Sequence, residues 1–209
     1  MDHDSSVPEA PQQSKGMAGL SGGFYTVARE ITVSMVERGL HEGGSYRYTA
    51  SVIILLQACL EAYINEFLSI HRQLSPKVIE PRLAELKIQN RSSLVDKWLK
   101  APLLFGEKTF EKGTEPFQSF RLLVSLRNTL GHYDPRFRTP TEFPSDKLAN
   151  LKTKFPFSYP GTADWTSQVL NLECARWGCR TVKALIPKFH EFVKGIDFSS
   201  SGQPWPDPP

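Results

Sequence analysis

The stretch SYRYTASVIILLQACLEAYINEF, residues 45–67, decides the fold class. Its apolar residues recur at spacings of three and four, which places them on one face of a helix. They are Val52, Leu55, Leu56, Cys59, Leu60, Tyr63 and Phe67. Ser45 is a residue type that caps helix N-termini, so we expect the helix to follow it. The longest apolar run, Val52 to Leu56, is too short to cross a bilayer, and we expect a core helix without membrane contact.

Three further long helices are predicted around this one. The same spacing recurs near residues 24–35, 117–130 and 164–189, and shorter helical patterns occur near 77–88, 93–100 and 146–152. No strand pattern of comparable strength is present. The sequence therefore predicts an all-α bundle of four long helices plus short helices. Residues 133–162 hold several prolines and are expected to form a long insert.

The two ends of the chain differ from its middle in composition. Residues 1–22 are rich in Ser, Pro, Gln and Gly, and the end reads SSSGQPWPDPP, in which four prolines exclude a helix. We predict a disordered N-terminal tail over 1–22, one helical domain over 23–196 and a disordered tail over 197–209.

Charge and cysteine content exclude several classes of protein. The net charge of +3 is too small to indicate nucleic-acid binding by itself, and 40% hydrophobic residues suffice for a core. Three cysteines, Cys59, Cys174 and Cys179, give neither a disulfide framework nor a zinc site, and we expect buried, unreactive thiols. The N-terminus has no signal peptide pattern, so we expect a cytoplasmic protein. No metal or other cofactor is expected.

Polar residues with catalytic potential interrupt an apolar helix where it ends. The segment LLVSLRNTLGHYDPRFR, residues 122–138, contains Arg127, Asn128 and His132. Asn128 and His132 are four residues apart and share a helix face. Gly131 ends the helix and lets His132 turn toward Arg127.

These three residues could carry out phosphoryl transfer without a metal. A histidine can exchange a proton with a hydroxyl near neutral pH, and an arginine can hold phosphate oxygens. Asn128 would orient the phosphate or the imidazole. The same residues also fit a purely structural role, in which His132 favours the negative end of the helix and Arg127 pairs with Asp134 or another carboxylate.

The residues that follow have an excess of positive charge. Residues 127–154 contain six Lys or Arg against three Asp or Glu. Tyr133 and Phe137 alternate with Arg136 and Arg138, a pattern suited to stacking bases and holding phosphates. Tyr133, Arg136 and Arg138 are therefore candidate RNA-binding residues.

The segment resembles the signature of the HEPN superfamily, whose members are helical bundles with an R-x4-6-H motif near the end of a long helix. Arg127, Asn128 and His132 match its shortest form, R-N-x-x-x-H, and the stretch from Leu60 to Asn65 is similar to an early core helix of several HEPN groups. The resemblance implies a metal-independent endoribonuclease with Arg127 and His132 catalytic and Asn128 supporting. It also implies a homodimer, often within toxin–antitoxin, antiviral or RNA-processing systems, with an antitoxin or other protein as a further partner.

Glu61 is a candidate supporting residue. It follows Leu60 among apolar residues, and a buried carboxylate needs a partner, which leads to the hypothesis that Glu61 holds Arg127 in place. The alternative is that Glu61, Asn65 and Glu66 form a solvated stripe.

Three functions stay open on the sequence. The first is an endoribonuclease that uses the 2′-hydroxyl of RNA as nucleophile. The second is a non-catalytic HEPN-like module for dimerisation or binding. The third is a nucleotide or small-ligand binder that uses the same Arg-rich region. A nuclease predicts Arg127 and His132 exposed together, whereas a docking module predicts an apolar surface or an Arg127 held in a salt bridge.

Overall fold

The computed structural model describes residues 19–40, 45–132, 143, 145–158, 164–193 and 207. Over these residues the protein is all-α, as predicted, and contains no strand. The longer helices are α1 (Leu20–Glu37), α2 (Tyr46–Leu74), α5 (Phe117–Gly131) and α8 (Leu172–Phe192). The shorter ones are α3 (Pro76–Glu85), α4 (Leu94–Lys100), α6 (Asp146–Ala149) and α7 (Trp165–Val169), with 3-10 turns at Ala101–Leu104 and Asn150–Thr153.

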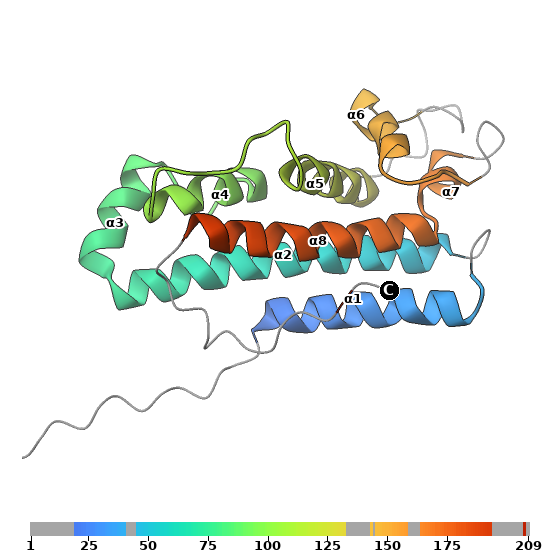
Figure 1. Ribbon diagram of the computed structural model, residues 1–209, viewed down its shortest axis with the longest axis horizontal. Coiled ribbons are helices and arrows are strands. Elements are labelled where there is room, and N and C mark those ends of the chain that lie inside the picture. Colours follow the sequence, from blue (N-terminus) through green and yellow to red (C-terminus); the bar gives the residue numbers. More distant parts are fainter. Residues whose placement is uncertain are drawn as a thin grey trace, which may run out of the picture.

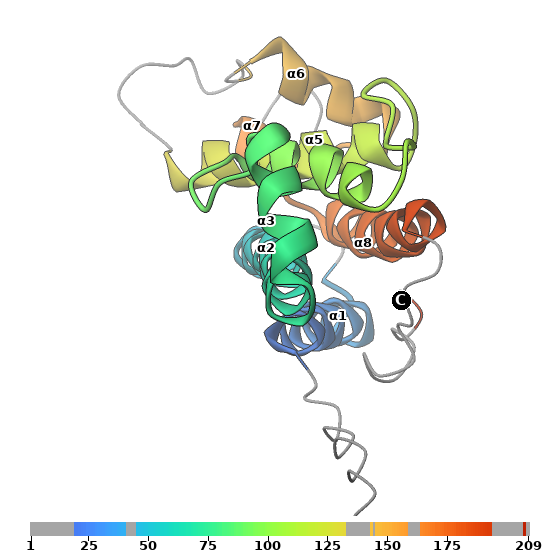
Figure 2. The same cartoon turned by 90° about the vertical axis from the view of Figure 1, so that its left-hand side faces the viewer.

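Helix α2 lies at the centre of the molecule. Figure 1 shows α1, α2 and α8 running side by side along the long axis, with α3, α4 and α5 on the other side of α2 and α8 from α1. The end-on view of Figure 2 shows the same order, and α2 packs against α1, α5 and α8. The apolar face predicted for α2 is fully buried at Val52, Leu56, Cys59 and Leu60, so this face forms the core.

Helices α2 and α8 approach each other closely at Gly178. A Cβ atom added at Gly178 would lie 2.7 Å from Cδ1 of Leu56 and 3.3 Å from Cδ1 of Ile53. The glycine thus allows a contact between the two helices that a side chain would hinder.

An aromatic cluster joins α4 and α5 to this pair. The Trp98 ring of α4 lies 5.2 Å from Phe189 of α8 and 5.7 Å from Phe120 of α5, measured between ring centroids. The indole N–H of Trp98 donates to the carbonyl oxygen of Leu60 at 3.2 Å, so this polar group is satisfied inside the core.

The prediction of one helix starting at Asp164 is wrong. The chain forms α7, breaks at residues 170–171 and starts again as α8. Asp164 accepts hydrogen bonds from the backbone of Thr166 and Ser167, and Asn171 accepts one from the N–H of Cys174 at 2.9 Å. Each side chain caps the helix that follows it, because short polar side chains compete for backbone donors and favour helix starts.

The starts of α1 and α2 also differ from the predictions. Ser45 precedes α2 as predicted, but its hydroxyl donates to the carbonyl oxygen of Leu170 at 3.3 Å and makes no cap bond. Helix α1 starts at Leu20, inside the predicted N-terminal tail, and the rest of both tails, apart from Gly19 and Asp207, lies outside the described residues.

Among the described helices, α2 is long and apolar enough to cross a membrane by length and composition. Of the window that meets this criterion, 44% is buried inside the protein. Core helices of water-soluble bundles meet the same criterion, so this is weak support for a membrane span.

Candidate functional site

The predicted motif lies at the exposed end of α5, which runs from the α4 side of the molecule toward α6 (Figure 1). The N–H of His132 donates to the carbonyl oxygen of Asn128 at 3.1 Å, so the last helical turn extends to His132. Gly131 is the last helical residue, and among the described residues only Gly39 and Lys87 have a positive φ. The helix thus ends at Gly131 as expected, but without a left-handed glycine.

The three side chains of the motif differ in exposure. Arg127 is half-buried, whereas Asn128 and His132 are exposed. Nη1 of Arg127 donates to Oδ1 of Asn128 at 3.5 Å, a long hydrogen bond. The same Nη1 atom lies 3.9 Å from the position that a Cβ of Gly131 would occupy, so the guanidinium group lies along the last turn of α5.

The structure thus brings Arg127 and Asn128 together and places His132 on the same end of α5. Within the described part of the chain, Arg127 has no ion pair with a carboxylate and no hydrogen bond to His132. Tyr133, Arg136 and Arg138, the predicted RNA-binding residues, lie outside the described residues, as does Asp134.

The expected burial of Glu61 is wrong. Its side chain is exposed on α2 and has no hydrogen bond or ion pair among the described residues. Position 61 follows the fully buried Leu60 but lies past the edge of the apolar face. Asn65 is exposed as well, whereas Glu66 is half-buried and accepts a hydrogen bond from the Ser21 hydroxyl at 2.9 Å. A solvated stripe therefore describes Glu61, but neither Glu66 nor Asn65, whose Oδ1 accepts a hydrogen bond from the buried Lys97.

The three cysteines are buried free thiols, as predicted. Burial raises the pKa of Cys59 and Cys174, and it raises the pKa of Cys179 to about 11. Because the thiolate is the reactive form, these thiols are unreactive near neutral pH. Among the described residues, no group of three His, Cys, Asp or Glu is placed to hold a metal ion.

Two histidines, His71 and His190, pack against aromatic rings. The His71 ring centroid lies 4.5 Å from that of Phe67 and 4.8 Å from that of Phe105, and burial lowers the pKa of His71. His190 is hydrogen-bonded to the Tyr63 hydroxyl, and burial lowers its pKa as well.

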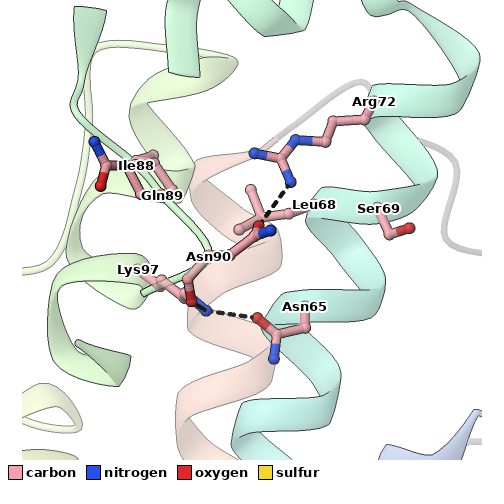
Figure 3. A pocket seen from close by; sticks show the side chains of 8 residues that line it. All are labelled: Asn65, Leu68, Ser69, Arg72, Ile88, Gln89, Asn90 and Lys97. Atoms are coloured by element: carbon pink, nitrogen blue, oxygen red, sulfur yellow. Dashed lines mark hydrogen bonds between the residues drawn. The ribbon is translucent and has the colours of Figure 1, made fainter. Parts of the chain in front are cut away.

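A second candidate site is a cavity of about 350 Å³ between α2, the segment 86–93 and α4, which we call the polar pocket (Figure 3). Its lining residues are Asn65, Leu68, Ser69, Arg72, Ile88, Gln89, Asn90 and Lys97. Nζ of Lys97 donates to Oδ1 of Asn65 and to the carbonyl oxygen of Asn90, both at 2.9 Å. Nη1 of Arg72 donates to Oδ1 of Asn90 at 3.2 Å.

Sequence reasoning did not find the polar pocket, although one signal was present. Leu94, Lys97 and Trp98 follow the helical spacing of three and four, which places Lys97 on the inner face of α4. A lysine on an apolar face indicates a buried polar contact, and Lys97 is indeed only 6% exposed.

Comparisons of the chain with protein-family models, with curated proteins and with solved structures gave no match.

Proposed function

We propose that this chain is a metal-independent endoribonuclease of the HEPN type, with its catalytic groups at the end of α5. One observation carries the proposal: Arg127 has no carboxylate partner among the described residues, and it lies on the same helix end as the exposed His132. A guanidinium group without a counter-charge can accept a phosphate, whereas one held in a salt bridge would favour a docking module.

The chemistry follows from these groups. The imidazole of His132 takes the proton of a ribose 2′-hydroxyl while that oxygen attacks the adjacent phosphorus. The new P–O2′ bond forms as the P–O5′ bond breaks, which leaves a 2′,3′-cyclic phosphate. Arg127 offsets the charge on the phosphoryl oxygens in the transition state, and the Asn128 amide, in contact with Arg127, orients the guanidinium group.

The leaving 5′-oxygen needs a proton from a second acid. A homodimer with two motifs facing each other would supply it from the imidazole of the second copy, which is the arrangement that the HEPN resemblance implies. The order of the longer helices α1, α2, α5 and α8, with the motif at the end of the third, supports a HEPN-like bundle.

The test is cleavage of a mixed RNA pool by the full chain in EDTA. We expect fragments with 2′,3′-cyclic phosphate ends, and a loss of rate of about 100-fold or more in His132→Ala and in Arg127→Ala. Arg121→Ala is the matched control, because Arg121 is an exposed cation of the same helix whose Nη1 contacts the Lys112 carbonyl oxygen.

Equal cleavage by the parent protein and all variants would indicate a contaminating nuclease and would contradict the proposal. No cleavage by a folded parent protein at any concentration would favour the alternative, a non-catalytic module for dimerisation or binding.

A further inference from the structure

The segment 86–93, which closes the polar pocket, is held in place by its own contacts. Lys87 adopts φ of 53° after α3, and the N–H of Ile88 then donates to the Leu83 carbonyl oxygen at 2.9 Å. Ile88 is 4% exposed and so anchors the segment in the core. The N–H of Gln89 donates to the Ser92 hydroxyl at 2.9 Å. The wall of the pocket is thus formed before any ligand binds.

Lys97 places a buried positive charge in this pocket. The side chain extends from α4, and Figure 3 shows its bond to Asn65 of α2. Both of its hydrogen-bond acceptors are neutral oxygens, and no carboxylate pairs with it in the described part of the chain. Burying an ammonium group without a counter-charge is costly. An ammonium group has three N–H donors, so one is left for a ligand.

Arg72 adds a second positive charge from α2. Its guanidinium group points toward Asn90, as Figure 3 shows. Nε of Arg72 lies 3.5 Å from Oε1 of Glu80, whose side chain is 60% exposed, so this ion pair is weak. The pocket is therefore lined by two cations, and Glu80, the carboxylate that pairs with Arg72, is solvent-exposed and does not line the pocket.

We propose that the polar pocket binds a small phosphomonoester. A phosphomonoester is close to a dianion at neutral pH and can compensate both Arg72 and Lys97, whereas one carboxylate or one phosphodiester group compensates a single cation. The amides of Asn65 and Gln89 and the hydroxyl of Ser69 offer both donors and acceptors to the polar body of such a molecule. A volume of about 350 Å³ suits a small molecule.

This site is separate from the proposed nuclease site. The polar pocket lies beside α3 and α4, at the other end of the molecule from α6 and α7, while α5 runs toward α6 (Figure 1). Loss of phosphomonoester binding and loss of RNA cleavage can therefore be tested independently.

The test is calorimetric titration of the full chain with AMP and with inorganic phosphate at constant ionic strength, with succinate as the carboxylate probe. We expect saturable binding of both phosphate probes by the parent protein. We expect at least a roughly tenfold weaker affinity in Lys97→Met and in Arg72→Gln, because each removes one charge-assisted contact. The matched control is Arg91→Gln, since Arg91 is exposed on the same segment and does not line the pocket.

Arg127→Ala should bind the phosphate probes as the parent protein does, which separates this site from the end of α5. If Lys97→Met does not fold, Arg72→Gln decides the test alone, because the Arg72 side chain is already 31% exposed. Absence of saturable binding, binding of succinate alone, or an equal loss in Arg91→Gln would overturn the proposal.

Discussion

At the scale of single residues, His71 makes stability depend on pH. Its ring lies between Phe67 and Phe105, and burial lowers its pKa below the ordinary value of 6.5. In the unfolded chain His71 binds a proton as the pH falls through that value, whereas the folded protein resists protonation. The stabilising contribution of the neutral ring is therefore complete above the unfolded pKa and is lost as the pH falls toward the folded pKa.

The variant His71→Leu removes this titration while keeping an apolar side chain between the two phenylalanines. We expect the free energy of unfolding to fall less between about pH 7.5 and about pH 5 in His71→Leu than in the parent protein. Urea unfolding at a series of pH values measures both profiles. Two parallel profiles would show that the environment of His71 does not favour the neutral form.

The motif at the end of α5 shows how far single residues can be predicted from sequence. The position of Arg127, Asn128 and His132 at an exposed helix end follows from Gly131 and the apolar spacing before it. The environments of Glu61 and Lys97 do not follow in this way. Spacing identifies the apolar face of a helix, but what covers its edges depends on other elements. Glu61 is left uncovered, and Lys97 is covered by the segment 86–93.

At the scale of helices, Asn171 decides where the last long helix begins. Oδ1 of Asn171 accepts a hydrogen bond from the N–H of Cys174 and so caps α8. Nδ2 of Asn171 donates to the Pro156 carbonyl oxygen at 2.9 Å and to the Ser158 hydroxyl at 3.2 Å. The sequence pattern could not show this break, because the apolar residues of α7 and α8 remain in one helical register and both helices pack on the same core.

Asn171→Ala should lower the free energy of unfolding by about 3 kcal/mol, since it removes a cap and leaves buried polar groups without partners. The matched control is Asp164→Ala, because Asp164 is the half-buried cap of α7. This variant should cost about 1 kcal/mol. Urea unfolding of both variants gives the comparison, and an equal loss would mean that the bonds to residues 156 and 158 add nothing.

At the scale of the whole molecule, the all-α class and the order of the helices were predictable because long amphipathic segments dominate the chain. One hydrophobic core then connects residues of every described helix from α1 to α8. The close contact at Gly178 and the aromatic cluster around Trp98 and Phe189 are tertiary features that no local pattern reveals. Such a continuous core predicts that the helices unfold together.

The fluorescence of Trp98 and of Trp177 can report on the unfolding of two different parts of this core. Trp98 lies in the aromatic cluster of α4, α5 and α8, while the Trp177 ring lies 5.5 Å from Phe155 and its indole N–H donates to the Ser119 hydroxyl at 3.4 Å. We expect variants that keep only one of these tryptophans, with the others replaced by Phe, to show coincident urea transitions by fluorescence and by far-ultraviolet circular dichroism.

The segment between α5 and α8, of which the structure describes Phe143 and residues 145–158 and 164–171, gives the strictest test of this prediction. Its contacts to the core include the rings of Phe155 and Trp177 and the bonds of Asn171. If these contacts belong to the common core, the Trp177 signal changes at the same urea concentration as the Trp98 signal. An earlier change at Trp177 would instead make this segment a separate, weaker unit resting on α5 and α8, and the parts of the chain would not unfold as one.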